Sequence, residues 1–235
     1  MGFFKDLAAV FNKREMTFID SFKESENIYS FLFEKDPDLH WEPGQYGLIS
    51  ITHKPIKNAT KPFSLASAPA ENVVRITTRI GDQPSEFKQA LLELKPGMKI
   101  KMSGAIGSFS LKNNNPTLLI AGGIGITPFR SMLKQHAASG NGENKQIHLL
   151  YTDSKKSYLF KDELDALADR SVADVTYLDS RENLEKEIES FIARYKDNGT
   201  FFVAGPKSLV ASVSAFLQGK KISKQKLKKD AFRGY

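Results

Sequence analysis

The strongest constraint on the fold is a mid-chain stretch where an apolar run gives way to glycines and then to a helical pattern. Residues 117–121 form an apolar run of strand length. Three glycines follow within four residues: Gly122, Gly123 and Gly125. An amphipathic run then begins at Thr127 and Pro128, and proline suits the first turn of a helix because its missing N–H costs nothing there. A strand, a glycine turn and a helix in this order bring backbone N–H groups up to a phosphate.

The glycine spacing differs from the dinucleotide pattern G-x-G-x-x-G, so the stretch predicts a phosphate-binding turn of another kind. An ordinary tight strand-to-helix turn is the alternative, and the rest of the chain must decide between the two. The length of 235 residues is enough for two domains.

Composition excludes several classes of protein. There are no cysteines, which removes disulfides, thiolate-held iron–sulfur clusters and a cysteine nucleophile. The four histidines are scattered without paired spacing, so we expect no metal site. No secretory signal is visible at residues 1–5, and the longest apolar run, 117–129, is shorter than the roughly 20 residues that span a bilayer. We therefore expect a soluble, cytoplasmic, monomeric protein.

The formal net charge of +7 is unevenly distributed. Seven cations fall within residues 220–235, against the single acidic residue Asp230. A nucleic-acid-binding protein usually spreads Lys and Arg along one face, so this pattern argues against nucleic acid. The lysine-rich segment is either a docking surface for an acidic partner or an ordinary solvated surface.

The first part of the chain has two patterns. Residues 2–12 are amphipathic and predict a short helix, which sets 1–14 apart as an N-terminal segment. Apolar and polar residues then alternate in short runs separated by turn residues, from 15 to 112. This region predicts a small antiparallel β-barrel, interrupted by one helix at 84–94.

The second part of the chain shows a different pattern of apolar residues. The polar segment 112–116 forms a natural boundary, and strand-like and helix-like segments alternate after it. The predicted strands are 117–121, 146–151, 173–178, 200–204 and 226–231. The predicted helices are 128–138, 160–169, 182–196 and 206–218. This order predicts a doubly wound parallel sheet in a nucleotide-binding α/β domain at 116–235.

Six short segments carry a resemblance to a known family. They are Trp-Glu-Pro-Gly-Gln-Tyr at 41–46, Lys-Pro-Phe-Ser-Leu-Ala-Ser at 61–67, Gly-Ala-Ile-Gly-Ser-Phe at 104–109, the glycine turn at 122–128, Ala-Gly-Pro at 204–206 and Phe-Arg-Gly-Tyr at 232–235. In this order and spacing, the chain from about Glu15 to Tyr235 resembles the ferredoxin–NADP reductase family. The resemblance implies a flavin-binding barrel followed by a domain that binds NADPH or NADH.

The resemblance assigns roles in the barrel half. The family's Arg-x-Tyr-Ser motif falls on Lys61, Phe63 and Ser64, with Pro62 between the first two. Phe63 would lie against the flavin ring, the Ser64 hydroxyl would reach flavin N5, and Lys61 would meet the flavin phosphates. Lys61 replaces Arg, which loses bidentate phosphate binding, and Phe63 replaces Tyr, which loses a hydroxyl. A barrel strand with one core ring is the alternative interpretation of Phe63.

Two further contacts with the flavin follow from the resemblance. The loop from Gly81 to Ser85 matches the second phosphate contact, which favours FAD over FMN. From the residues alone, Ser85 can cap the helix that follows it or present N–H groups to a pyrophosphate. The terminal Tyr235 would cover the flavin face that the nicotinamide must approach. The lysines before it would lie around the mouth of the same site, where an acidic electron acceptor would dock.

The nucleotide site would be built from the second domain. Thr127 and Pro128 would border the flavin and the nicotinamide, together with Gly205 and Pro206. Ala204 stands where many relatives carry a cysteine beside the nicotinamide. The adenosine ribose would be bound by Asp153, Ser154 and Lys155, followed by Lys156. The lysines favour the 2′-phosphate of NADPH, Asp153 suits the free 2′-hydroxyl of NADH, and a solvated loop is an equal alternative.

Together these features predict an FAD-containing NAD(P)H oxidoreductase. Hydride would pass from the nicotinamide to the flavin, and the electrons would then pass to a separate acceptor such as ferredoxin, flavodoxin or a small molecule. Two other functions stay open. One is the reduction of free flavins or ferric chelates, and the other is a non-enzymatic nucleotide-binding or interaction subunit.

Overall fold

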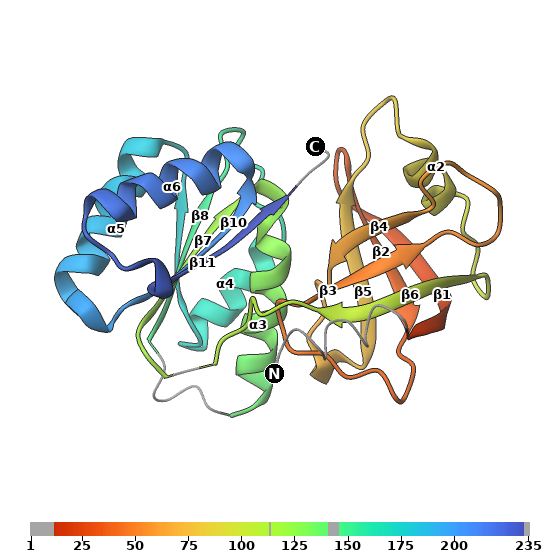
Figure 1. Cartoon of the computed structure of the whole chain (residues 1–235), viewed down its shortest axis with the longest axis horizontal. Helices are drawn as coiled ribbons and strands as arrows, with labels where there is room; N and C mark the ends of the chain where they lie inside the picture. The colour runs from red at the N-terminus through yellow and green to blue at the C-terminus, as the bar shows by residue number, and fades with distance from the viewer. Residues whose placement is uncertain (1–11, 113, 141–145, 233–235) are drawn as a thin grey trace. The chain divides into compact units, whose positions relative to one another are not determined.

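The computed structural model describes residues 12–112, 114–140 and 146–232 (Figure 1). The chain divides into two compact units, Met1–Ser110 and Leu111–Tyr235. Each unit has its own sheet, and the two sheets differ in kind. The first is antiparallel and the second is parallel.

The first unit is a six-stranded antiparallel sheet in the order β4-β3-β6-β1-β2-β5. Its strands are β1 Lys13–Ser25, β2 Ile28–Glu34, β3 Tyr46–Ser50, β4 Thr60–Ser64, β5 Val73–Arg79 and β6 Lys99–Ile106. The short helix η1 Pro69–Glu71 precedes β5, and α2 Glu86–Leu92 follows it. The backbone N–H of Ala66, just beyond β4, donates to the carbonyl of Arg75 in β5 at 2.8 Å. This contact joins the two edges of the sheet into the predicted barrel.

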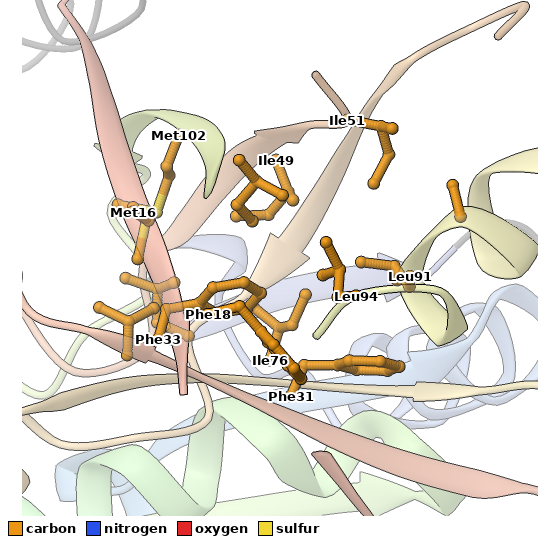
Figure 2. Packing of buried hydrophobic residues seen from close by; sticks show 14 of the residues in the cluster. Met16, Phe18, Phe31, Phe33, Ile49, Ile51, Ile76, Leu91, Leu94 and Met102 are labelled. Atoms are coloured by element: carbon orange, nitrogen blue, oxygen red, sulfur yellow. The ribbon is translucent and has the colours of Figure 1, made fainter. Parts of the chain in front are cut away.

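Alternating side chains of the barrel strands build its core. Figure 2 shows Phe18 of β1, Phe31 and Phe33 of β2 and Ile76 of β5 gathered together, with Met16 and Met102 beside one another. Phe18 and Phe33 pack edge to face with ring centroids 5.7 Å apart. Burying one such side chain stabilises the fold by roughly 1.5–3 kcal/mol, so the period-two pattern fixes which face of each strand points inward.

The second unit is a five-stranded parallel sheet in the order β11-β10-β7-β8-β9. Its strands are β7 Thr117–Gly122, β8 Ile147–Thr152, β9 Asp174–Leu178, β10 Thr200–Pro206 and β11 Leu227–Phe232. Its helices are α3 Thr127–Ala138, α4 Lys161–Asp169, α5 Arg181–Tyr195 and α6 Lys207–Gly219, with short helices η2 Gly123–Ile126, η3 Lys196–Asn198 and η4 Lys224–Lys226. The predicted strands and helices of this unit are confirmed, with ends that shift by at most two residues.

The order of the parallel strands creates a topological switch point. From β7 the chain proceeds through β8 and β9 on one side, then returns to β10 and β11 on the other. Helices α5 and α6 pack against one face of the sheet, and α3 and α4 lie on the other (Figure 1). In such sheets, ligands bind outside the carboxyl ends of the strands at the switch point, which here is the junction of β7 and β10.

The N-terminal segment differs in part from expectation. The helix predicted for residues 2–12 falls almost entirely outside the described residues, and β1 already begins at Lys13. Residues 13 and 14 are therefore strand, because they pair with Ser103 and Met102 of β6. Within the described residues, no helix is both long enough and apolar enough to cross a membrane.

Candidate functional site

The glycine turn lies at the junction of β7 and β10. A Cβ on Gly125 would come within 2.2 Å of the carbonyl oxygen of Ala204, and one on Gly122 would come within 2.3 Å of the Leu209 side chain. At these two positions the absence of a side chain allows the turn to pack directly against the end of β10. The packing alternative raised by the sequence therefore accounts for Gly122 and Gly125.

Gly123 differs from these two glycines, because a Cβ added there would meet no atom of the described residues closer than ordinary van der Waals distance. Its φ of +52° lies in the left-handed region, and the atom nearest to a Cβ added there would be Oδ2 of Asp153 at 3.9 Å. The buried Tyr151 hydroxyl donates to the Gly123 carbonyl at 2.9 Å and accepts from the Leu159 N–H at 3.0 Å. The open side of the turn is thus held in place from β8 and bordered by Asp153.

The loop after β8 is organised around Asp153. The Asp153 carboxylate accepts from the backbone N–H of Lys155 at 2.8 Å, and the Asp153 N–H donates to Leu178 at the end of β9 at 3.1 Å. Lys156 forms an ion pair with Asp179, with Nζ 2.9 Å from Oδ2. The hydrogen bond and charge of Asp179 raise the pKa of Lys156, and the same pair lowers the pKa of Asp179.

A tyrosine cluster beside this loop was missed from the sequence. The Tyr158 ring lies 5.3 Å from the Tyr151 ring and 4.8 Å from the Tyr177 ring. Tyr177 also donates to Asp165 at 2.6 Å. The available signal was the placement of tyrosines near the carboxyl ends of two adjacent predicted strands. Asp179, the ion-pair partner of Lys156, was missed because it lies beyond the next strand.

The carboxyl end of β10 lies beside the glycine turn and completes this end of the parallel sheet. Gly205 has φ +148°, and a Cβ there would come within 2.9 Å of the Gly122 carbonyl oxygen. Pro206 pairs with Phe232 of β11. The structure therefore brings eight predicted nucleotide-site residues to one edge of the sheet: Gly122, Gly123, Gly125, Thr127, Pro128, Asp153, Gly205 and Pro206. Ser154 and Lys155 follow on the exposed loop, and Tyr235 lies outside the described residues.

The lysine-rich segment, which begins at residue 220, does not surround the carboxyl ends of the strands, and this finding corrects one expectation. We expected the lysines to lie at the mouth of the flavin site, but Lys220 to Lys226 precede β11 and lie at its amino end. Leu227 pairs with Phe201 at the amino end of β10, whereas Gly205 lies near the carboxyl end of the same strand. Lys220 also forms an ion pair with Glu189 of α5 at 2.5 Å. The placement was wrong because the strand separates these lysines from the chain terminus.

In the first unit, three of the sequence motifs interlock. Trp41 Nε1 donates to the Ser67 carbonyl at 3.2 Å, which joins segment 41–46 to segment 61–67. The N–H of Leu65 donates to the Gln45 carbonyl at 3.0 Å, and Gln45 Nε2 donates to the Gly107 carbonyl at 3.0 Å. Segments 41–46, 61–67 and 104–109 therefore form one corner of the barrel.

The predicted flavin residues Lys61, Phe63 and Ser64 lie on β4, with Pro62 between Lys61 and Phe63. Phe63 is half-buried, and its ring stacks on Phe87 of α2 with centroids 5.7 Å apart and planes 22° apart. Ser85 caps α2, its Oγ accepting from the Lys88 N–H at 3.5 Å, and Gly81 lies in the exposed loop before it. The Phe63–Phe87 contact thus brings the two predicted phosphate contacts, on β4 and before α2, to one region.

This region fits a bound anion. Arg79 ends β5, and its Nε is buried with no hydrogen-bond acceptor among the described residues. Burial and the Arg79 charge together lower the pKa of Lys88. Two cations held close together in a partly buried place are stabilised by an added phosphate group, which accepts several hydrogen bonds at once.

Known proteins share features of both units. Residues 119–215 match the family model described as an oxidoreductase NAD-binding domain. The toluate 1,2-dioxygenase electron transfer component of Pseudomonas putida is 29% identical over 227 residues, covering 92% of this chain and 64% of that protein. Flavohemoprotein A of Dictyostelium discoideum is 27% identical over 214 residues, covering 82% of this chain and 53% of that protein.

The solved structures agree on the fold. The ferredoxin–NADP⁺ reductase of Plasmodium falciparum superimposes with a TM-score of 0.78 at 19% identity, covering 94% of this chain and 97% of that one. The chain therefore has the fold of the ferredoxin–NADP⁺ reductases. The glycine turn at the end of β7 lies within the part that matches an oxidoreductase NAD-binding domain.

The chain spans between about half and two thirds of the length of these curated relatives. Across residues 119–215 the family model covers β7 to α6, which includes every glycine of the switch point. The barrel motifs at 41–46, 61–67 and 104–109 lie outside that match.

Proposed function

We propose that the reductase oxidises NAD(P)H with bound FAD and passes the electrons to a separate acceptor, such as a ferredoxin or a flavodoxin. The observation that carries the proposal is the glycine turn at the switch point of an NAD-binding domain, where Gly123 has a positive φ and a Cβ added there would contact, in the described part of the chain, only the Asp153 carboxylate, at 3.9 Å. A cytoplasmic location belongs to the same proposal.

The roles proposed for the barrel residues come from the resemblance to the family motifs, and their placement on β4 and beside α2 supports them. When bound, FAD would accept the hydride and pass the electrons on to a separate acceptor. Lys61 would bind the flavin phosphates together with the backbone of Gly81 and Ser85. Phe63, stacked on Phe87, would offer a rigid aromatic face, and the half-buried Ser64 hydroxyl would donate a hydrogen bond to the reacting nitrogen. Tyr235 would cover the other face of the flavin ring.

The second unit would bind the nucleotide. The Gly123 turn would receive the pyrophosphate, and Pro206 and Thr127 would border the nicotinamide. Asp153 and Ser154 would contact the adenosine ribose. This division leaves positioning to the protein and the redox chemistry to the two cofactors.

A preference for NADPH over NADH belongs to the proposal and rests on Lys155. The ammonium of Lys156 is already paired with Asp179, so Lys155 is the lysine with fewer competing contacts for a 2′-phosphate. Lys155→Ala is expected to lower the NADPH-to-NADH ratio of kcat/KM about 10-fold, since one charge-assisted contact is lost. Lys156→Ala is the matched control and should change the ratio less. A ratio that neither substitution moves would remove the basis for the preference.

The electron acceptor in this proposal is a separate protein. A relative named as a dioxygenase electron transfer component supports a protein acceptor. The 235 residues contain no cysteine, so a thiolate-held cluster is not built from them. The test compares kcat/KM for a ferredoxin, a flavodoxin, free FMN and ferric citrate. We expect the two proteins to be the better acceptors.

Reduction of free flavins or ferric chelates is the second candidate, and one observation favours it. Lys61 replaces the bidentate arginine of the family motif, which weakens the hold on a flavin phosphate. Under this alternative, FMN or ferric citrate is the best acceptor, and FAD leaves the protein on dilution. A nucleotide-binding subunit without activity would be consistent with the departures at Lys61, Phe63 and Ala204, but it gives no role to the Ser64 hydroxyl.

A further inference from the structure

We propose that Arg79 is a further flavin-binding residue, whose guanidinium group binds a phosphate of FAD. The inference rests on the proposed function, because it assumes that FAD is the cofactor. It adds a cation that belongs to none of the sequence motifs.

The first observation is that Arg79 is only partly satisfied by its own chain. Its Nε is buried and lacks a hydrogen-bond acceptor among the described residues. The other buried arginines of the described chain differ in this respect. Arg75, on the same strand, donates from Nε to Ser30 at 3.0 Å and pairs with Glu24. Arg130 pairs with Glu163 at 2.7 Å. Since buried N–H groups are nearly always paired, the acceptor for Arg79 should lie beyond the described residues, and we assign it to a bound ligand.

The second observation is the place of Arg79 in the barrel. The Ala66–Arg75 hydrogen bond joins the strand edges β4 and β5, and the connection through η1 reverses the chain between them. Lys61 lies five residues before Ala66, and Arg79 lies four residues after Arg75. The two cations therefore lie at the same end of neighbouring strands, the end to which Phe63 and Phe87 attach α2.

A further cation, Lys88 of α2, lies near Arg79. Lys88 of α2 is close enough to Arg79 for the arginine charge to add to burial in lowering its pKa. Cations are brought together in a protein at an electrostatic cost, which a bound anion removes. The neighbouring charges of Arg79 on β5 and Lys88 on α2 suit the two negative charges of a pyrophosphate.

The chemistry distinguishes Arg79 from Lys61. A guanidinium group presents N–H donors in a planar fork that matches two phosphate oxygens, whereas an ammonium group acts as a point charge. The family motif has Arg at the position of Lys61, and this chain lacks that fork. Arg79 can supply it from the neighbouring strand.

The experiment measures flavin binding rather than activity. Purified reductase is stripped of flavin, and the dissociation constants of FAD and riboflavin are measured by fluorescence quenching for wild type, Arg79→Met and Arg79→Lys. Arg14→Met is the control, because Arg14 is a barrel arginine paired with Asp36. FAD should bind Arg79→Met about 10- to 100-fold more weakly, because the variant loses hydrogen bonds to a charged group. Arg79→Lys should lie between.

Riboflavin carries no phosphate, so its binding should be the same in all four proteins. The thermal midpoint of the flavin-free Arg79→Met variant should match wild type, since the lost side chain leaves no acceptor unpaired. The proposal is overturned if Arg79→Met binds FAD as well as Arg14→Met does, or if riboflavin binding falls as much as FAD binding. Wild type that binds no FAD would overturn the proposed function and this inference together.

Discussion

The backbone of Gly125 lies directly against that of Ala204, so that a Cβ at position 125 would come within 2.2 Å of the Ala204 carbonyl oxygen. This contact joins the glycine turn after β7 to the end of β10. It therefore fixes the shape of the switch point, where the reductase is expected to bind its nucleotide.

Replacing Gly125 tests this packing. Gly125→Ala should destabilise the protein by about 1–3 kcal/mol, because the added methyl group forces the strand ends apart, and it should weaken NAD(P)H binding. Chemical unfolding and nucleotide titration measure the two effects. Gly219→Ala is the control, since nothing lies within 4 Å of a Cβ at that position. Equal stability of the two variants would show that the contact is not needed.

Ser64 is predicted to act in hydride transfer rather than in flavin binding. It is half-buried at the end of β4, opposite Tyr46. Ser64→Ala should retain FAD but slow flavin reduction by a factor on the order of 10–1000, equivalent to ~1–4 kcal/mol of transition-state stabilisation. Stopped-flow reduction at saturating nucleotide measures the rate, with Ser50→Ala on β3 as control. An unchanged rate would place Ser64 away from the reacting nitrogen.

The ion pair between α3 and α4 should matter for stability. Arg130 is 3% exposed and pairs with Glu163, which also contacts Lys134 at 2.7 Å. Burial raises the pKa of Glu163, but the hydrogen bonds and charges of Arg130 and Lys134 outweigh it and lower the pKa overall.

Glu163→Gln should therefore cost about 3 kcal/mol in the free energy of unfolding, because it leaves the buried Arg130 charge less compensated. The exposed pair of Glu182 and Lys186 gives the control, and Glu182→Gln should cost less than about 1 kcal/mol. Urea unfolding measures both variants. The prediction is contradicted if the two substitutions cost the same.

His148 should make stability depend on pH. Burial lowers the pKa of His148 below 6.5, Arg194 lowers it further, and Asp174 opposes both. The unfolded chain therefore takes up a proton on this histidine more readily than the folded chain does. The contribution to stability is complete above pH 6.5 and is lost as the pH falls below it towards the folded pKa.

Urea unfolding at about pH 7.5 and about pH 5.5, on either side of the ordinary histidine pKa, measures this dependence. Wild type should lose more stability on acidification than His148→Gln does. The same loss in His148→Gln as in wild type would assign the acid sensitivity to other groups.

Much of the fold could be predicted because its signals are local. The strands of the second unit are continuous apolar runs, and the helices between them are amphipathic, so their bounds follow from the sequence to within two residues. The site residues were predicted from the resemblance to a known family rather than from local signals. The structure brings Asp153 and Gly205, which are distant in sequence, to the same end of the parallel sheet as Gly122.

The rest depends on contacts that sequence spacing does not reveal. Arg79 has no motif, and its importance comes from an Nε that finds no acceptor in the described part of the chain. The lysines from 220 to 226 are near Tyr235 in sequence, yet β11 carries the chain about 20 Å between them at roughly 3.3 Å per residue. Of the four glycines at the strand ends, Gly122, Gly125 and Gly205 are required by close packing, whereas a Cβ on Gly123 would come no closer than 3.9 Å to its nearest neighbour among the described residues.

The visible spectrum of the purified reductase tests the central claim most directly. After incubation with FAD and removal of the excess, the protein should retain a flavin absorbance band in the visible range. Anaerobic addition of NADPH or NADH should bleach that band, and admission of an electron acceptor should restore it. A colourless protein that takes up no added FAD, or a bound flavin that neither nucleotide reduces, would contradict the account.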